Sequence, residues 1–341
     1  MPVPLHHPES FYPGGKDGSF SDKAIKLLAN QKKSWDLLRK NYELLDQVKT
    51  REFHFDHFTI KAQFNPSRIT SSSARIEPEF IAARTCFLCS ENLPEQQEKL
   101  EIDRDFILLC NPYPIFREHF TILTKAHVPQ EIKPNFSNLL TLSKILNGHI
   151  LFYNGPYCGA SAPDHFHFQA GNKSYLPIEK QLNPLKDETK GPWFSNEKIR
   201  IWGVEQYPGR FILFESSSIP SLVAAFDSVY ASLQDIILLE QEPLLNILSL
   251  FTNQSWQIIL FPRSKHRPSH YFETGDKEML ISPASVDFGG VFILPREKDF
   301  IKITEKDIID IFNETSISER LFNDLKEFVQ KKMEKQLRNI Q

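Results

Sequence analysis

The segment 159–169 carries the densest group of chemically active side chains in this sequence of 341 residues. His165, His167 and Gln169 occupy alternate positions there, and phenylalanines fill the two positions between them. Successive side chains of a β-strand point to opposite faces, so a strand would place the imidazoles and the carboxamide on one face and the phenylalanines in a core. Solvent-facing strand positions usually carry Lys, Glu or Thr. The pattern therefore predicts a polar functional surface rather than an ordinary exposed strand.

The chemistry available to these side chains is group transfer at phosphorus. An imidazole attacks phosphorus well once its other ring nitrogen donates a proton to a carbonyl group, because that hydrogen bond fixes the tautomer. Glutamine can donate a hydrogen bond to a phosphoryl oxygen, but it cannot act as a base on water. A third histidine at position 169 would suit hydrolysis. Gln169 instead favours transfer from a covalent nucleotidyl-histidine to another acceptor.

A second motif, Cys-x-x-Cys, is formed by Cys86 and Cys89. The sequence holds 4 cysteines, too few for a disulfide scaffold in a chain of this length, which favours a reducing compartment and a metal-binding or redox role. No thioredoxin-like βαβ pattern surrounds the pair, so a redox role is disfavoured. Two free thiols in a core remain the alternative to a metal site.

Positively charged side chains in two short segments are candidates for binding a substrate phosphate. Arg68 and Arg75 lie in a segment rich in serine, and Arg263 and Lys265 belong to the compact run Arg-Ser-Lys-His-Arg. Arginine matches phosphate geometry as a bidentate fork. A single basic residue is ordinarily a solvated surface side chain, and only the density of the 263–267 run strengthens the functional interpretation.

The elements that position these motifs follow from hydrophobic periodicity and turn residues. Residues 1–20 are rich in Pro, Gly and Ser and predict a surface arm. Ser21 is a candidate N-cap for a helix over 22–49, and strands are expected within 53–76. Residues 172–200 are typical of a linker or a long excursion. Further strands are predicted at 105–109, 120–124, 150–153, 165–170, 211–214, 257–261 and 291–294, and helices at 136–146, 221–239, 305–314 and 318–338.

Two segments echo each other and indicate a duplicated unit. Residues 120–129 and 256–268 are both apolar strands that end in Lys, His and Pro, one in each half of the chain. This placement predicts two related α+β units. Helices and strands are mixed without regular βαβ alternation, which favours the α+β class.

Composition excludes several classes of protein. The 40 Lys and Arg residues against 43 Asp and Glu residues give a formal net charge of −3, which is unlike a general nucleic-acid binder. No basic segment followed by an apolar stretch begins the sequence, and no apolar run approaches the roughly 20 residues that span a bilayer. We therefore expect no nucleic-acid partner, no membrane partner and a cytoplasmic location.

His-x-His-x-Gln after a turn of Gly, Ala and Ser resembles the transferase branch of the histidine-triad superfamily. This branch includes galactose-1-phosphate uridylyltransferase, the GDP-hexose phosphorylases and the dinucleoside-tetraphosphate phosphorylases. In the uridylyltransferase pattern the second histidine is the nucleophile, which corresponds to His167, and the glutamine corresponds to Gln169. The family's asparagine, eleven residues before the first histidine, matches Asn154, and its phosphate-contacting serine lies near Ser161.

The cysteine pair fits the same resemblance. The segment 84–89 resembles the zinc segment of the uridylyltransferases, which implies that Zn²⁺ is bound by Cys86, Cys89, His127 and His165. Two sulfur and two nitrogen ligands form a closed set of the type used for structural zinc. His119 is an alternative to His127, and we prefer His127 because 125–127 matches the family's strand-end Lys-x-His pattern.

The C-terminal half resembles a different relative. The segments 261–268, 281–283, 288–291, 296–300 and 314–318 are similar to the C-terminal region of the GDP-hexose phosphorylases, which lack this cysteine pair. The chain also resembles DUF4922, an uncharacterised bacterial family. The resemblance covers roughly residues 60–320 and leaves the base and the sugar of the substrate open.

The resemblance implies two histidine-triad-like halves, each an antiparallel sheet flanked by helices. We expect an N-terminal arm and helix over 1–52, a first half over 53–200 that carries both motifs, and a second half over 201–341. It also implies a homodimer, because relatives pair through sheet edges.

The expected activity is that of a nucleotidyltransferase or phosphorylase. Its substrate would be a nucleoside diphosphate sugar or a dinucleoside polyphosphate, and phosphate or a sugar phosphate would accept the nucleotidyl group from His167. Two alternatives stay open. One is a hydrolase of nucleotide conjugates, and the other is a zinc-stabilised module that binds a nucleotide without turnover.

Overall fold

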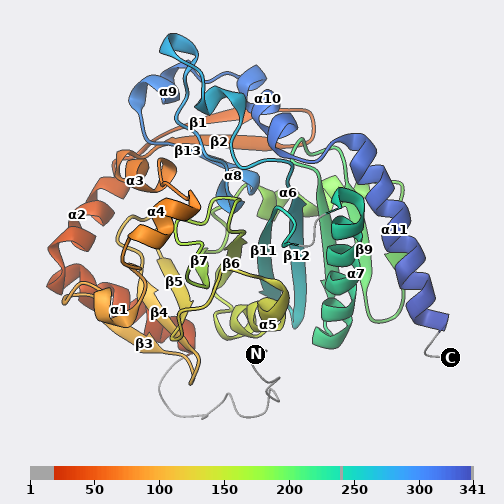
Figure 1. The fold of residues 1–341 in the computed structure, drawn as a ribbon, viewed down its shortest axis with the longest axis horizontal. Coiled ribbons are helices and arrows are strands. Elements are labelled where there is room, and N and C mark those ends of the chain that lie inside the picture. Colours follow the sequence, from red (N-terminus) through yellow and green to blue (C-terminus); the bar gives the residue numbers. More distant parts are fainter. Residues whose placement is uncertain (1–18, 239–240, 339–341) are drawn as a thin grey trace.

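The computed structural model describes residues 19–238 and 241–338, so the predicted arm over 1–20 lies almost entirely outside the described residues. One large sheet, whose strands do not follow one another in sequence order, runs through the molecule (Figure 1). Its pairings are antiparallel throughout. In spatial order its ten strands are β3 (Lys99–Glu101), β4 (Phe106–Cys110), β5 (His119–Thr124), β7 (His167–Asn172), β6 (His149–Asn154), β11 (Leu245–Thr252), β12 (Ser255–Pro262), β10 (Phe211–Ser216), β9 (Arg200–Val204) and β8 (Phe194–Ser195).

The strand order reveals an internal duplication. Read from its two edges inward, the sheet gives β3-β4-β5-β7-β6 and β8-β9-β10-β12-β11, which is the same connectivity twice. A helix precedes the innermost strand in each half, α5 (Phe136–Ile145) before β6 and α7 (Ile219–Ile237) before β11. The halves join where β6 pairs with β11, so the two antiparallel sheets expected from the sequence form one continuous α+β layer.

The duplication was predicted from two similar sequence segments, and the topology shows that these segments are not equivalent. The echoing segments 120–129 and 256–268 contain β5 and β12, whereas the counterpart of β5 is β10 and that of β12 is β7. The likeness of the two segments is therefore not a correspondence of equivalent strands. β12 contains no histidine, so the His-x-His-x-Gln chemistry belongs to the first half alone.

The two largest of three hydrophobic clusters in the described residues lie on opposite faces of the large sheet. Helices α1 (Phe20–Ser34), α2 (Asp36–Leu45), α5, α7 and α11 (Glu319–Arg338) contribute to one core. Phe136 of α5 stacks on Phe226 of α7 with ring centroids 3.9 Å apart, which joins the helices of the two halves. The second core includes α6 (Ile178–Asp187), α8 (Ser285–Phe288), α9 (Glu297–Lys302) and α10 (Glu305–Thr315).

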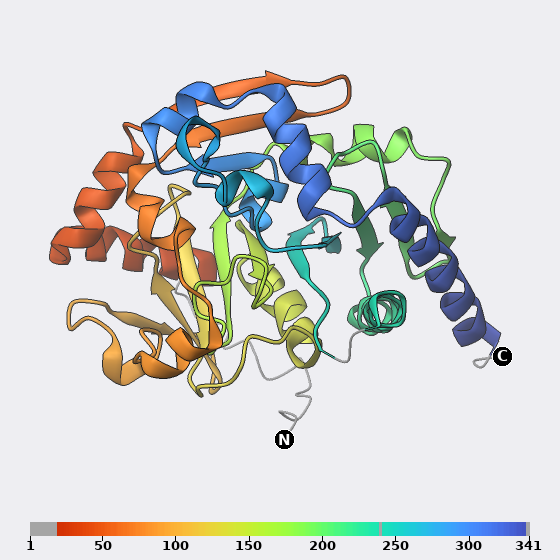
Figure 2. The ribbon, with the colours of Figure 1, turned by 45° about the horizontal axis from the view of Figure 1, so that its top comes forward.

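A small three-stranded sheet packs into the second core. Its strands are β1 (Lys49–His54), β2 (Thr59–Phe64) and β13 (Val291–Leu294), so it combines the beginning of the chain with a late segment (Figure 2). β1 and β2 are antiparallel, whereas β13 runs parallel to β2. The first and second halves of the sequence are therefore linked at this sheet as well as at the β6–β11 pair.

Several predicted elements differ in the structure. The helix expected over 22–49 is two helices, because Trp35 is extended and buried between them. The expected linker 172–200 contains α6, whose Ile178, Leu182 and Leu185 are buried at helical spacing. In the described part of the chain, no helix is long and apolar enough to cross a membrane.

Candidate active site

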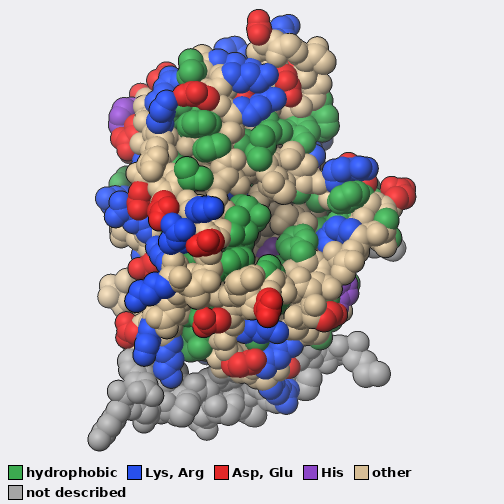
Figure 3. Space-filling view, turned by 90° about the vertical axis from the view of Figure 1, so that its left-hand side faces the viewer, with side chains coloured by type: hydrophobic (Ala, Val, Ile, Leu, Met, Phe, Trp, Pro, Cys, Tyr) green, Lys and Arg blue, Asp and Glu red, His purple; other side chains and the backbone are tan. Residues whose placement is uncertain are grey.

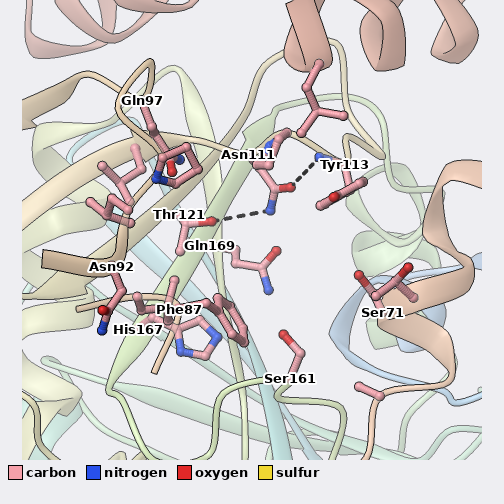
Figure 4. Close-up of a pocket in the computed structure, with 18 of the residues that line it drawn as sticks. Ser71, Phe87, Asn92, Gln97, Asn111, Tyr113, Thr121, Ser161, His167 and Gln169 are labelled. Atoms are coloured by element: carbon pink, nitrogen blue, oxygen red, sulfur yellow. Dashed lines mark hydrogen bonds between the residues drawn. The ribbon is translucent and has the colours of Figure 1, made fainter. Parts of the chain in front are cut away.

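A cavity of about 610 Å³ opens on the face of the first half (Figure 3). Its walls come from β4, β5 and β7, from the segment 84–97, and from the segment that contains α3 (Ile69–Ser72) and α4 (Pro78–Ala83). Neither of these two short helices buries a residue, so their segment forms an outer wall. His167, Gln169 and Ser161 line the cavity, as Figure 4 shows.

His167 is held as a neutral imidazole with its Nε2 atom available. Its Nδ1 lies 2.8 Å from the carbonyl oxygen of His165, so Nδ1 carries the proton and donates it there. Burial lowers the pKa of His167 to about 4. Gln130 fixes the backbone at the start of β7, because its Oε1 accepts the His167 N–H at 2.8 Å and its Nε2 donates to the His167 carbonyl at 2.9 Å. The predicted nucleophile therefore has the required tautomer.

Gln169 is oriented by His119, which lies on the adjacent strand β5. The Nδ1 atom of His119 accepts the backbone N–H of Ile115 at 3.1 Å. The proton of the neutral ring is therefore on Nε2, which donates to Gln169 Oε1 at 2.9 Å. Burial lowers the pKa of His119 to about 3, so this tautomer is kept at neutral pH. The Gln169 amide group is left as a donor toward the cavity.

Asn154 is oriented in the same manner at the end of β6. Its Oδ1 accepts the Ser285 backbone N–H at 2.9 Å, the Ser285 hydroxyl at 2.7 Å and the Asn246 amide at 3.0 Å. The carboxamide oxygen is thus fully engaged and the NH₂ group is free to donate. Asn154, Ser161 and Gln169 together line a smaller cavity of about 60 Å³ that adjoins the large one.

The four expected metal ligands come together beside the active-site strand. Cys86 Sγ lies 3.4 Å from His165 Nδ1, and Cys89 Sγ lies 3.2 Å from His127 Nδ1. All four ligand atoms lie within 4.8 Å of one another, which fits tetrahedral coordination of one ion. His165 Nε2 donates to the Thr124 carbonyl at 2.7 Å, so its Nδ1 lone pair is directed at the cluster. His119 lies outside this cluster and serves Gln169 instead.

The four predicted basic residues separate into two pairs. Arg68 and Arg75 line the large cavity, and Arg68 also lines the smaller one. Arg263 is 1% exposed, and its guanidinium donates to carbonyl groups and to the side chain of Asn246. Lys265 pairs on the surface with Glu314 at 2.6 Å. The prediction that Arg263 and Lys265 bind substrate is therefore corrected: neither lines a cavity of the site, and the donors of Arg263 are used within the fold.

Family models match the chain in two consecutive parts. The model described as "Domain of unknown function (DUF4922)" matches residues 27–172, and the model "GDPGP1-like, C-terminal domain" matches residues 184–336. The first match contains both chemical motifs, and the second contains the 263–267 run. The border between the two matches falls within the segment that holds α6.

Curated relatives match less than half of the chain, and a solved structure matches most of the fold. Galactose-1-phosphate uridylyltransferase of Clostridium perfringens is 29% identical over 168 residues, 44% of this chain and 32% of the relative. The Halalkalibacterium halodurans protein of the same name is 25% identical over 165 residues, 44% of this chain and 31% of the relative. The chain thus spans about a third of the length of these relatives. Yeast Ap4A phosphorylase Apa2 in complex with Ap4A has a TM-score of 0.54 at 15% identity, covering 84% of this chain and 97% of that chain. These matches support the resemblance of the chain to the transferase branch of the histidine-triad superfamily.

The large cavity has further lining residues that the sequence analysis did not identify. Phe87 lies beside His167 in Figure 4, on the segment between the two cysteines, and is 46% exposed. Asn92 donates to the Cys86 carbonyl at 2.8 Å and Gln97 to the Cys110 carbonyl at 3.1 Å, so each amide orientation is fixed. An exposed aromatic ring and two oriented carboxamides can stack on and hydrogen-bond a planar heterocycle. The only sequence signal was their proximity to the cysteine pair.

Proposed function

We propose that this protein is a histidine-triad transferase that moves a nucleotidyl group by double displacement through a covalent bond to His167. Its donor substrate would be a nucleoside diphosphate sugar or a dinucleoside polyphosphate. The observation that carries the proposal is the fixed tautomer of His167, whose Nδ1–H is bound to the His165 carbonyl while Nε2 is unprotonated in a residue that lines a 610 Å³ cavity. A neutral imidazole with a free Nε2 is the form that attacks phosphorus.

In the first half-reaction, His167 Nε2 forms a bond to the α-phosphorus and the bond from phosphorus to the leaving phosphate oxygen breaks. The amide groups of Gln169 and Asn154 and the hydroxyl of Ser161 donate to the phosphoryl oxygens as negative charge develops there. In the second half-reaction, an oxygen of phosphate or of a sugar phosphate forms the new bond to phosphorus and the bond to His167 breaks. Gln169 cannot act as a base on water, which favours transfer over hydrolysis.

The proposal includes one structural Zn²⁺ bound by Cys86, Cys89, His127 and His165. The donor set supports it, because two sulfur and two nitrogen ligands with no place left for substrate are typical of structural zinc sites. A bound Zn²⁺ would supply rigidity rather than reactivity. His165 would then be fixed at both ring nitrogens, and its carbonyl would hold the proton of His167 in place. The free cysteines fit a reducing, cytoplasmic location.

The direct test is to trap the covalent intermediate. The full chain is incubated with a panel of nucleoside diphosphate sugars and dinucleoside polyphosphates that are labelled at the α-phosphorus. We expect acid-labile, base-stable label on His167, its discharge by added orthophosphate or sugar phosphate, and no label on His167→Ala. The rate of turnover should fall by several orders of magnitude in that variant.

Two other outcomes would contradict the proposal. Release of nucleoside monophosphate by water alone, without any added phosphate, would indicate a hydrolase. Tight nucleotide binding that survives His167→Ala, with no adduct and no exchange for any donor in the panel, would indicate a binding module.

A further inference from the structure

The smaller cavity, of about 60 Å³, adjoins the nucleophile's cavity without containing the nucleophile. Its walls include Ser161, Gln169 and Arg68, which also line the large cavity, and Arg267 and Ser282 from the second half of the chain. His167 lines only the large cavity. A phosphorus atom held by Ser161 and Gln169 would therefore lie between His167 and the smaller cavity. Figure 4 shows these two side chains between His167 and Ser71.

Two guanidinium groups line this cavity, and neither makes a hydrogen bond or a close ion pair with a carboxylate in the described residues. The acidic groups that act on them from farther away are Asp287 for Arg68 and Glu77 for Arg267. Arg68 Nη1 donates to the Tyr113 carbonyl at 2.9 Å, while its Nε is shielded from solvent and has no hydrogen-bond partner in the described chain. Arg267 donates through Nε to the Ser282 hydroxyl at 3.2 Å and through Nη2 to the Ala74 carbonyl at 2.8 Å. All of these partners are neutral. Positive charge held in a partly enclosed site without a counter-ion in direct contact is costly unless an anion binds there.

The remaining groups on the cavity wall fit an anion of tetrahedral shape. The fixed amide groups of Asn154 and Gln169 donate toward it, and the Ser161 hydroxyl is close by. Asp287 is the acidic side chain on the wall, and its two oxygens accept the backbone N–H groups of Ala284 and Ile293 at 2.9 and 3.0 Å. The charge on the wall is therefore positive, and the donors converge from several directions.

We propose that this cavity is the subsite for the phosphate that leaves and the phosphate that enters, with Arg267 as its principal ligand from the second half. The inference rests on the proposed function and names the site of its second substrate. In an in-line displacement the leaving oxygen departs opposite the attacking atom, which places it in the cavity beyond Ser161 and Gln169. The bond from phosphorus to that oxygen breaks with its electron pair on the oxygen, and both arginines stabilise the resulting charge. The acceptor oxygen attacks from the same cavity.

The ligand chemistry is that of a phosphate dianion, either free orthophosphate or the phosphate of a sugar 1-phosphate. A cavity of about 60 Å³ accommodates such a group but no nucleoside. The base and ribose therefore belong to the large cavity, beside Phe87. The second half of the chain, whose sequence has no His-x-His motif of its own, would thus contribute to the reaction through Arg267.

Binding of orthophosphate to the full chain tests the inference without turnover. Equilibrium binding of labelled orthophosphate is measured for the wild type, Arg267→Gln, Arg267→Lys and Lys265→Gln. Charge-assisted hydrogen bonds of this kind change affinity by about 10- to 100-fold, so we expect that loss in Arg267→Gln and a smaller loss in Arg267→Lys. Lys265→Gln is the matched control, because Lys265 belongs to the same basic run but pairs with Glu314 outside the cavity.

Arg267→Gln could weaken binding by unfolding, so thermal melting of every variant accompanies the measurement. Arg267→Lys, which keeps the charge, must then bind more tightly than Arg267→Gln at similar stability. The inference is overturned if the wild type binds no orthophosphate, or if Arg267→Gln binds it as tightly as the wild type does.

A kinetic measurement separates the two phosphate sources and the two proposals. The labelled intermediate is discharged with orthophosphate, which yields a nucleoside diphosphate, or with glucose 1-phosphate, which yields a nucleotide sugar. We expect the half-saturating concentration of the effective acceptor to rise about 10- to 100-fold in Arg267→Gln. Phosphate binding that depends on Arg267 together with no adduct on His167 would contradict the proposed function and leave the phosphate site standing. An adduct on His167 that is discharged equally well in the wild type and in Arg267→Gln would support the proposed function and contradict the phosphate site.

Discussion

At the scale of single residues, the site depends on two histidines that are each locked in one tautomer. His167 donates through Nδ1 to the His165 carbonyl, and His119 accepts through Nδ1 from the Ile115 N–H. The first hydrogen bond leaves Nε2 of His167 unprotonated, as the proposed nucleophile requires, and the second makes Nε2 of His119 a donor to Gln169. Opposite protonation of the two rings is thus dictated by one carbonyl and one N–H of the backbone. Low pKa values keep both rings neutral.

His119 is therefore a positioning residue, and His119→Phe isolates this role. The substitution keeps a ring between Phe116 and Phe152, whose centroids lie 5.4 and 6.1 Å from that of His119, but removes the donor to Gln169. We expect kcat for nucleotidyl transfer to fall about 10- to 100-fold with KM nearly unchanged, because the Gln169 amide acts mainly in the transition state. The measurement is steady-state kinetics with the best donor of the panel.

His149→Phe is the matched control for this prediction. His149 is another buried histidine, on β6, and it faces Glu118 rather than the cavity. His119→Gln, which can still donate to Gln169, should restore part of kcat. Wild-type kcat in His119→Phe would show that Gln169 needs no partner. Equal losses in the two phenylalanine variants would show that the effect is one of packing.

The sequence located the candidate site residues better than the residues that position them. His167 and Gln169 could be found because their alternation on a strand is a local pattern. The role of His119 could not, because it depends on β5 and β7 being adjacent, and nothing local to residue 119 encodes that pairing. For the same reason the sequence of the 263–267 run could not distinguish the roles of Arg263 and Arg267. Only the tertiary structure shows that one is enclosed by carbonyl groups and the other borders a cavity.

At the scale of elements, the cluster of Cys86, Cys89, His127 and His165 connects three segments that are far apart in the sequence. The segment 84–97 forms one wall of the large cavity, and His165 immediately precedes β7. An ion held by all four side chains would tie that wall to the strand that carries the nucleophile. His127 is exposed, whereas Cys89 is half-buried and packs with Cys86 against a small apolar cluster, so the ion would reinforce an edge that already has some apolar packing.

Metal content and stability test this arrangement together. We expect about one zinc per chain in the purified protein, and none in Cys89→Ser. A ligand present at about 1,000 times its Kd stabilises a fold by about 4 kcal/mol. Loss of the zinc should therefore lower Tm by roughly 5 to 15 °C. Cys158→Ser is the control, because Cys158 is a buried thiol outside the cluster and should leave the metal content unchanged. Full zinc content in Cys89→Ser would exclude this ligand set.

Complete burial did not by itself hide a strand from sequence reasoning. β13 is buried at all of its positions and was predicted with the bounds that it has, Val291–Leu294. The central strand β11 was missed, although seven of its eight residues are buried and it shows the same lack of alternation. The break at Trp35 has no proline or glycine to mark it. It follows from burial of the indole, which only the assembled fold provides.

At the scale of the whole molecule, the two halves meet at a buried polar network. β6 pairs with β11, and Asn154 of the first half receives a hydrogen bond from Asn246 of the second. Asn246 in turn accepts from Arg263, and Ser285 donates to Asn154 from the segment that precedes β13. The donor amide of Asn154 in the active site is therefore aligned by residues of the other half. The geometry of the candidate site in the first half therefore depends on the packing of the second half against it.

Arg263 holds the two halves together through this network. We therefore expect its substitution to lower the stability of the fold rather than the affinity for substrate. Its guanidinium donates to the Thr315 carbonyl at 2.9 Å, the Pro283 carbonyl at 3.0 Å and two further carbonyls at 3.2 Å, besides Asn246. Arg263→Met leaves these buried acceptors without a partner, so we expect the free energy of unfolding to fall by about 3–5 kcal/mol. Lys265→Met removes one exposed ion pair and should cost less than about 1 kcal/mol. Urea unfolding of both variants makes the comparison. An Arg263→Met protein of wild-type stability with a raised KM for phosphate would instead indicate that Arg263 binds substrate.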